Sequence, residues 1–445
     1  MVVVVVRILG GFTFFELKAY DHVLTARLPE PPSDRVIVVE VARSDLEAQA
    51  SGDAKNLTRD VTDATLIHAI NQLKQSGAKV IGVDWYLPSE TTAWTEESLA
   101  AFQPQTRAEF TGNQIITVPH SSTTEQSTTA IYGVCAQPYT TQDVKQPPVP
   151  APNPDAIPSE RIGFSNFAVD ADGVLRRHLV GNGLPETDAA TSPCQATVSF
   201  SALMALQYLG LKNPNLASTG PDSTSSGSPP SHPLHNLSTI LETANIDPIN
   251  ALMYGGYHAI YPGHFELMLN YREPVGNRLR ESFTHISIQD LKAGRVEPEV
   301  FKGKIVLLGL TAESYASDEF ATPYGDVYGV TLQAYMVDHI LSLALGERRQ
   351  IWVWPKLVEW AWIIAWGVAG AMLGYWRRDH PRWLVFSLAG GLLIIYLTGR
   401  FTMGLLAGWI PVVPPMLGFV LSHGIVVYTD ARIGRMGSEQ AKLDP

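Results

Sequence analysis

The sequence predicts an α/β domain, with a mainly parallel sheet covered by helices, followed by a C-terminal bundle of three transmembrane helices. Two runs, Arg35–Val41 and Ala78–Trp85, are apolar without alternation, which is typical of strands buried on both faces. An amphipathic helix between them, Leu66–Leu73, places its apolar residues on one face, and Gly77 is suited to end it. A strand, a helix and a strand in this order form a βαβ unit, which implies parallel pairing and a right-handed crossover.

The same pattern returns later in the chain. Gly303–Leu310 reads as another buried strand, and a polar loop leads from it into a helical run that starts at Val330. Gln114–Pro119 is consistent with a further strand, and the run from Ala196 is helical. We therefore expect one α/β domain over residues 16–346.

Two segments do not fit the core of this domain. Residues 145–160 are dense in proline, and residues 217–234 are rich in serine, glycine and proline. We expect both to be flexible surface excursions from one domain. A domain boundary at either place is the alternative.

Three apolar segments free of Lys and Arg lie near the C-terminus, at 357–376, 383–399 and 401–428. A helix of about 20 apolar residues spans a hydrocarbon core about 30 Å thick, so each segment is long enough to cross a bilayer. Three buried helices of a large soluble domain are the alternative, but the loops between the segments are too short to fold a domain around them. The sequence therefore predicts a membrane protein.

Two features of these segments concern helix packing. Pro411, Pro414 and Pro415 interrupt helical hydrogen bonding and predict a third helix that is kinked or broken near its middle. Small residues recur at four-residue spacing between Gly367 and Gly374, which permits close approach of another helix.

The distribution of basic residues predicts the orientation of the helices. Short cytoplasmic loops retain Lys and Arg, and such residues occur in the first loop, 377–382, and in the tail, 429–445. This pattern places the loop and the short tail in the cytoplasm, and the large domain outside a plasma (inner) membrane, in the periplasm. Arg348, Arg349 and Lys356, just before the first segment, count against this orientation.

An external domain requires a leading segment that directs it across the membrane. Met1–Phe15 is apolar but short, is interrupted by Arg7, and lacks the basic start and small-residue cleavage site of a signal peptide. We interpret it as the remnant of a leading transmembrane helix. A β-strand at Val2–Val6 is the alternative.

Charge and cysteine content narrow the class of protein further. The formal net charge of −11 at pH 7 argues against nucleic acid as a partner, because nucleic acid binding requires a basic surface. Cys135 and Cys194 both lie in the predicted external part, where an oxidising compartment would allow a disulfide. Two unrelated thiols are the alternative.

Searches for catalytic motifs in the sequence are negative. There is no His-Glu-x-x-His, no Walker loop, no Gly-x-Gly-x-x-Gly after a strand and no Cys-x-x-Cys pair, so we expect neither an enzyme nor a bound metal or cofactor. The run GFSNF resembles a nucleophile elbow around Ser165 but lacks its second glycine.

The run DADG at Asp170–Gly173 resembles the start of a calcium-binding loop. The later oxygen ligands are missing, so a hairpin turn is the better interpretation. Arg176 and Arg177, which follow this turn, are expected on opposite faces of the hairpin, so at most one of them could face a ligand.

Polar residues beyond the carboxyl ends of parallel strands are the best candidates for a ligand site, because open α/β sheets bind ligands there. Five residues fit this rule or could supply an opposing charge: Asp84, Arg272, Thr311, Asp318 and Thr322. The alternative for each is a structural cap or a surface ion pair.

Several blocks of sequence, in this order, resemble the second type of CHASE domain, an extracytoplasmic sensory module of bacterial cyclases and histidine kinases. They are AYDHVLTARLPEPPSDRVIVVEV, GAKVIGVDW, IGFSNFAVDADGVLRR, NYR, and FKGKIVLLGLTAES with ATPYGDVYGVTLQAYMVDHILS. The resemblance covers about Glu16 to Gly346, and three transmembrane helices usually follow in the family. The spacing and the run IWVWP are similar to cyanobacterial members. A transmembrane helix precedes the first block in the family, which agrees with our interpretation of Met1–Phe15.

The resemblance implies a receptor whose outer domain binds an unknown small molecule or senses an envelope condition, and whose helices carry the change inward. In one respect the sequence departs from the usual plan, since after Tyr428 only seventeen residues remain, and no effector domain is present. The effector is therefore expected to be absent from this chain or to be a separate membrane protein, and a homodimer is expected. A structural or assembly subunit that binds an envelope protein is the alternative function.

Overall fold

A computed structural model describes most of the chain as two compact units. The described residues are 2–42, 45, 64–103, 107–111, 114–118, 129–140, 145–146, 148–183, 192–215, 233–248, 255–257, 264–276, 278–311, 319–377 and 380–440. The first unit, here the helical unit, contains residues 1–28, 249–262 and 349–445. The second unit, here the sheet unit, contains residues 29–248 and 263–348. The sheet unit thus starts after the expected boundary at Glu16.

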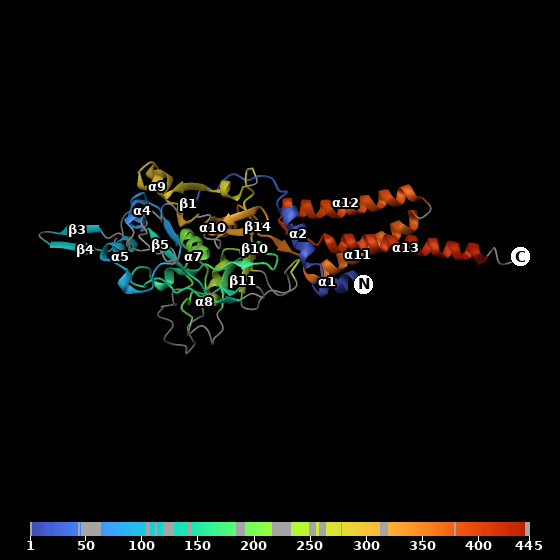
Figure 1. The fold of residues 1–445 in the computed structure, drawn as a ribbon, viewed down its shortest axis with the longest axis horizontal. Helices are drawn as coiled ribbons and strands as arrows, with labels where there is room; N and C mark the ends of the chain where they lie inside the picture. The colour runs from blue at the N-terminus through green and yellow to red at the C-terminus, as the bar shows by residue number, and fades with distance from the viewer. Residues whose placement is uncertain are drawn as a thin grey trace. The chain divides into compact units, whose positions relative to one another are not determined.

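The sheet unit is built on a six-stranded sheet in which every pair of neighbours is parallel (Figure 1). The strand order is β12-β1-β13-β2-β5-β8. Their bounds are β1 Val36–Val41, β2 Val80–Asp84, β5 Ala130–Cys135, β8 Ile162–Phe164, β12 Thr284–Ser287 and β13 Ile305–Leu310. The predicted mainly parallel sheet and the strands predicted from apolar runs are confirmed. The position of β13 between β1 and β2 was not predicted.

Helices cover both faces of this sheet. On one face, α4 (Ala64–Gln75) and α9 (Ile288–Lys292) contact each other, and their apolar residues join those of the strands in one core. On the other face, α7 (Phe200–Leu209) contacts β2, β5 and β8, and α10 (Gly329–Ala344) contacts β1 and β13.

Two strand glycines allow the second pair of helices to approach closely. A Cβ atom at Gly82 would lie 2.4 Å from the sulfur of Met204, and one at Gly309 would lie 2.3 Å from Cβ of Val330. These distances are far below van der Waals contact, so glycine at both positions is a packing requirement.

A second, antiparallel sheet contains β9 (Ala168–Val169), β10 (Leu175–Asn182) and β11 (His264–Met268). The DADG run forms the turn before β10, as predicted: the amide of Gly173 donates to the carbonyl of Asp170, and Gly173 has a φ of +79°.

The prediction that Arg176 and Arg177 face opposite sides was wrong. Each guanidinium forms an ion pair of 2.7 Å with Asp170. A β-bulge shifts the register of β10 between Leu175 and Arg177, and this shift brings both side chains to the same carboxylate.

The remaining described elements of the sheet unit are short. Four small strands form two hairpins, and two helices lie outside the main layers: β3 Arg107–Thr111 with β4 Gln114–Val118, β14 Glu319–Thr322 with β15 Gly325–Tyr328, and the helices α5 Glu96–Phe102 and α8 Pro233–Thr243. The predicted strand at Gln114–Pro119 is confirmed as β4. The strands β6 Tyr139–Thr140 and β7 Lys145–Gln146 also pair.

The structure corrects one of the two expected excursions. In the described part of residues 145–160, Ala156 and Ile157 are each 1% exposed and belong to the main core, and Val149 forms a β-bridge with Ala136. The prolines keep this stretch extended, but its apolar residues pack against the sheet. The second excursion, 217–234, lies almost entirely outside the described residues.

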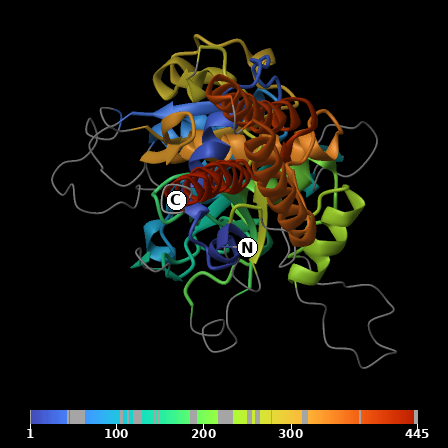
Figure 2. The same ribbon diagram turned by 90° about the vertical axis from the view of Figure 1, so that its right-hand side faces the viewer.

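In the described part of the helical unit, the helices are α1 Val2–Ile8, α2 Thr13–Leu24, α11 Lys356–Arg377, α12 Pro381–Leu406 and α13 Val413–Gln440 (Figures 1 and 2). The alternative of a strand at Val2–Val6 is wrong, because these residues are helical. The three long helices contact one another pairwise.

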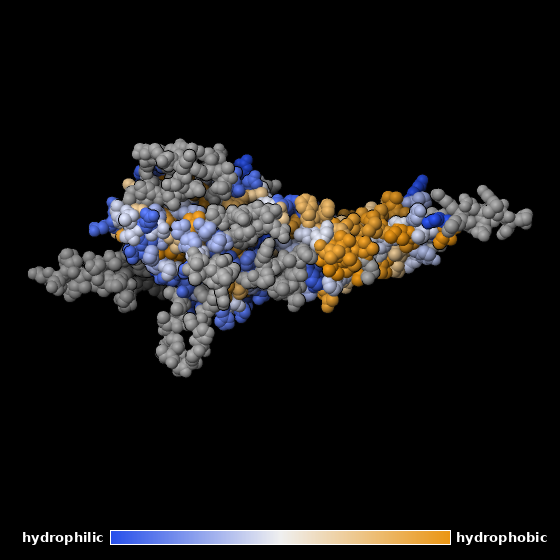
Figure 3. Space-filling model, turned by 60° about the horizontal axis from the view of Figure 1, so that its bottom comes forward, coloured by the Kyte–Doolittle hydropathy of each residue, from blue (hydrophilic) through white to orange (hydrophobic). Residues whose placement is uncertain are grey.

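Within the described residues, α11 and α12 are the two helices that are long and apolar enough to cross a membrane. Only 22% and 17% of their apolar windows are buried, whereas a core helix of a soluble protein would be mostly buried. Figure 3 shows apolar residues gathered at the surface of these helices. The third span remains a prediction for α13, whose C-terminal part is polar.

The boundary between the second and third segments differs from the prediction. α12 continues through Arg400 to Leu406, and the turn follows at Ala407, which has a left-handed φ of 55°. Pro411 precedes α13, and Pro414 and Pro415 lie in its first turn, where a proline breaks no helical hydrogen bond. The predicted third segment, 401–428, is therefore broken between Leu406 and Val413, as one form of the prediction required, and α13 itself contains no proline after its first turn.

The small residues of α11 serve contacts within the chain. A Cβ atom at Gly370 would lie 2.4 Å from the carbonyl oxygen of Phe419, and one at Gly374 would lie 2.9 Å from that of His423. Both contacts are with α13, so the four-residue spacing allows α11 and α13 to pack backbone to backbone.

Candidate functional site

The carboxyl ends of the six parallel strands form one edge of the main sheet, here the carboxyl edge. Asp84 is the last residue of β2 and pairs in register with Gly309 of β13. Thr311 follows β13 directly, and its amide donates to the carbonyl of Val41 at 3.1 Å. Both side-chain positions are half-buried. The structure therefore brings together two of the five predicted ligand residues at this edge, on neighbouring strands.

Hydroxyl groups extend the polar surface of the carboxyl edge toward β5 and β8. Ser165 follows β8, and its hydroxyl donates to the carbonyl of Cys135 at 3.3 Å. The hydroxyl of Tyr86, two residues after Asp84, lies 3.2 Å from that of Ser165. Cys135 at the end of β5 forms a disulfide with Cys194, with Cα atoms 5.6 Å apart. The disulfide that the sequence left open is therefore present beside this edge.

A network of buried amides continues the edge beyond β5. The side chain of Asn166 accepts from the backbone amide of Gln137 at 2.8 Å and donates to its carbonyl at 3.0 Å. The side-chain amide of Asn182 donates to the side-chain oxygen of Gln137 at 2.6 Å. One signal for this network was present in the sequence, since Asn166 belongs to the GFSNF run, but the partners of Asn166 are too distant in the chain to be predicted.

A charged cluster at the far side of the same edge was also missed. Glu40 of β1 accepts hydrogen bonds from His285 at 2.9 Å and from Arg280 at 2.6 and 3.0 Å. Burial raises the pKa of the Glu40 carboxyl, but these hydrogen bonds outweigh that effect and lower the pKa to about 2. A single carboxylate inside a buried strand run was the available signal, because such a group requires partners.

Arg272 does not lie at the carboxyl edge. Its guanidinium forms a bidentate pair with Asp338 of α10, with both distances 3.1 Å, and also donates to the carbonyl of Pro31 at 2.9 Å. Asp338 is fully buried and Arg272 is 8% exposed. These contacts use the charge of Arg272 to neutralise a buried carboxylate, which is the structural alternative, and the ligand role stays a prediction.

The other two predicted residues also lie apart from the edge or outside the described residues. Thr322 ends β14, and its hydroxyl donates to the carbonyl of Gly325 and accepts from the amide of Tyr324. It closes the turn of the β14–β15 hairpin, which is the structural alternative. Asp318 lies outside the described residues.

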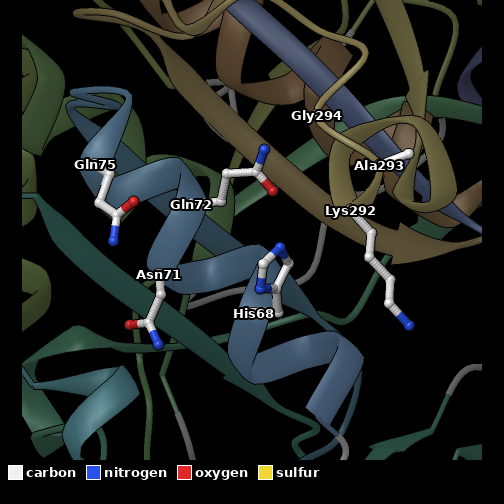
Figure 4. Close-up of a pocket in the computed structure, with 7 residues that line it drawn as sticks. All are labelled: His68, Asn71, Gln72, Gln75, Lys292, Ala293 and Gly294. Atoms are coloured by element: carbon white, nitrogen blue, oxygen red, sulfur yellow. The ribbon is translucent and has the colours of Figure 1, made fainter.

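A shallow hollow of about 360 Å³ lies between α4 and α9 (Figure 4). It is lined by His68, Asn71, Gln72, Gln75, Lys292, Ala293 and Gly294. The four lining residues from α4 belong to the polar face of that helix. The residues that line the hollow supply side-chain amides, an imidazole and an ammonium group but no carboxylate. This hollow is on a helical face of the domain and not at the carboxyl edge.

Comparison with known families shows to which family the chain belongs. The sequence profile of the CHASE2 domain family matches residues 1–372, which is more than four-fifths of the chain. The chain belongs to the CHASE2 family. No curated protein and no solved structure matches it. CHASE2 domains are extracellular sensory domains of signalling receptors, so the resemblance noted in the sequence is confirmed. In this CHASE2 chain, the carboxyl edge combines a carboxylate, several hydroxyls and nearby amides.

Proposed function

We propose that this chain is a membrane-anchored CHASE2 sensor that binds a small polar molecule at the carboxyl edge of its parallel sheet. The observation that supports the site is the convergence of Asp84, Thr311, Tyr86 and Ser165 at the ends of neighbouring strands. A carboxylate among hydroxyls recognises a ligand that donates hydrogen bonds, such as an amine or a polyhydroxy compound.

The proposed role is binding and not catalysis. The Ser165 hydroxyl contacts Tyr86 and the carbonyl of Cys135, and within the described residues no imidazole is hydrogen-bonded to it. A serine nucleophile requires an adjacent base, so this geometry favours recognition over acyl transfer.

The proposed location is the plasma membrane, with the sheet unit in the periplasm. The disulfide between Cys135 and Cys194 supports an oxidising compartment. Exposed aromatic residues occur near both ends of α11, namely Trp352 before it and Tyr375 and Trp376 at its end, as in the aromatic belts of membrane proteins. Its 22 residues extend about 33 Å, which matches a hydrocarbon core. The helices would present the change to a second copy of the chain or to a membrane effector.

The test is a thermal-shift screen of the full chain in detergent, with amines, amino acids, sugars and polyols as probes. A ligand that prefers the folded form raises the melting temperature. We expect at least one probe to do so, and we expect Asp84→Asn to abolish the shift. Gln72→Ala, in the hollow between α4 and α9, is the matched control and should leave the shift unchanged. A shift that Gln72→Ala removes and Asp84→Asn retains would place the site in the hollow and contradict the proposal.

A further inference from the structure

A short part of the chain crosses from the sheet unit into the helical unit and back. Residues 249–262 belong to the helical unit, whereas the residues before and after them belong to the sheet unit. Within this segment the structure describes Gly255–Tyr257, here the inserted turn, and all three residues are buried. The segment connects to β11, which begins at His264.

Two cations of the helical unit hold the backbone of the inserted turn. Arg7 of α1 donates to the carbonyls of both Gly255 and Gly256, the latter at 2.9 Å, and Lys356 of α11 donates to the carbonyl of Gly255 at 2.9 Å. Glu359 accepts from both cations at 3.3 Å. Charge-assisted hydrogen bonds to buried groups are among the strongest non-covalent contacts, so the turn is fixed at its carbonyls.

The aromatic side chain of Trp409 packs against the inserted turn. A Cβ atom at Gly256 would lie 2.3 Å from the ring of Trp409, and one at Gly255 would lie 2.6 Å from it. The ring of Tyr257 meets Trp409 edge to face, with centroids 5.8 Å apart. The turn and Trp409 therefore have no room to move independently.

Trp409 lies four residues before Val413, where α13 begins. The amides of Val412 and Val413 donate to one carboxylate oxygen of Glu16, at 3.1 and 2.6 Å. A carboxylate at this place caps the start of the helix and complements its dipole. A displacement of Trp409 thus acts on a helix start that is capped by the buried side chain of Glu16.

We infer that the inserted turn is the element that transmits changes in the sheet unit to α13. A shift of β11 displaces the turn through the chain, and the turn moves Trp409 and the capped start of α13. Inside the sheet unit, Arg348 and Glu30 form an ion pair at 3.0 Å, so the chain connections at residues 29 and 348 are tied to each other. The inserted turn lies on a different connection, between residues 248 and 263. This inference rests on the proposed sensor function.

The first arm of the test uses Gly256→Ala in the full chain in lipid nanodiscs, read out by hydrogen exchange of residues 407–416. The added methyl must push Trp409 away, so we expect about fivefold faster exchange at the start of α13. Gly404→Ala, where a Cβ atom meets nothing within 4 Å, is the matched control and should change nothing. Trp409→Phe combined with Gly256→Ala should restore slow exchange. Unchanged exchange at 407–416 in Gly256→Ala would overturn the inference.

The second arm tests transmission from the sheet unit and needs no ligand. Glu266→Gln removes the ion pair with Arg177 in the β10–β11 sheet and should speed exchange in both β11 and residues 407–416. If Glu266→Gln leaves β11 unchanged, Glu266→Ala replaces it. Three glycines inserted on each side of residues 249–262 should keep the response of β11 and remove that of residues 407–416. A response that survives these insertions, or one that is missing while β11 responds, would contradict the inference. The proposed ligand site is tested separately by the thermal-shift screen.

Discussion

Replacing Cys135 and Cys194 together by alanine removes a constraint on the unfolded chain. The two residues are 59 positions apart and both are fully buried. In the chain-entropy model, a closed loop of this length stabilises the folded state by about 4 kcal/mol. For a unit of about 300 residues, each kcal/mol corresponds to about 1.5 °C, so the melting temperature of the sheet unit should fall by about 6 °C.

The assay compares the thermal unfolding of the oxidised chain, the chain with dithiothreitol, and the double variant. The reduced chain and the double variant should unfold at similar temperatures, and dithiothreitol should have no effect on the variant. Because the chain has only two cysteines, thiol titration of the denatured, unreduced protein should detect none. Two titratable thiols, or equal melting temperatures with and without reductant, would refute the reasoning.

Three further predictions concern other contacts. The pKa of Glu40 is about 2 in the folded state against an ordinary value of 4.5, so the stability that Glu40 supplies is present above pH 4.5 and is lost as the pH falls toward 2. The urea midpoint of Glu40→Gln should therefore depend less on pH across this range than that of the unmodified chain. Parallel pH profiles of the two proteins would contradict this. Asp338→Ala leaves a buried guanidinium without its carboxylate and should cost about 3–5 kcal/mol in urea unfolding. Asp290→Ala, in an exposed pair, should cost less than about 1 kcal/mol, and equal costs would show that the buried pair has no special structural role. Gly370→Leu should separate α11 from α13 and lower stability in detergent by about 1–3 kcal/mol. The control variant Gly390→Leu should not lower it, because a side chain at Gly390 faces open space. Similar melting curves for the two variants would show that the packing of α11 against α13 is not required.

The sequence predicted the parts of the fold that are strongly apolar and locally patterned. β1, β2, β13 and α4 all fall in such runs. β12 and β8 were missed because they have four and three residues, which is too short for a period to show. The boundary of α12 was misplaced because Arg400 was taken as a loop, although one arginine within a long helix does not end it.

The candidate site was predicted only where a general rule of parallel sheets applied. Asp84 and Thr311 follow apolar strands directly, so the rule located them. Arg272 was assigned to a ligand because its partner, Asp338, is 66 positions away in a helix. Pairings of this range depend on the complete fold, and nothing local in the sequence reports them.

The position of β13 in the main sheet also has a consequence for biogenesis. Val36 pairs with Ile305, so a strand from late in the chain lies between two strands from early in it. The sheet cannot close until synthesis has passed Leu310, and shorter nascent chains have no central strand around which to collapse. A polypeptide that stays unfolded until late in translation can still pass through a secretion channel, which suits a domain that is exported before it folds.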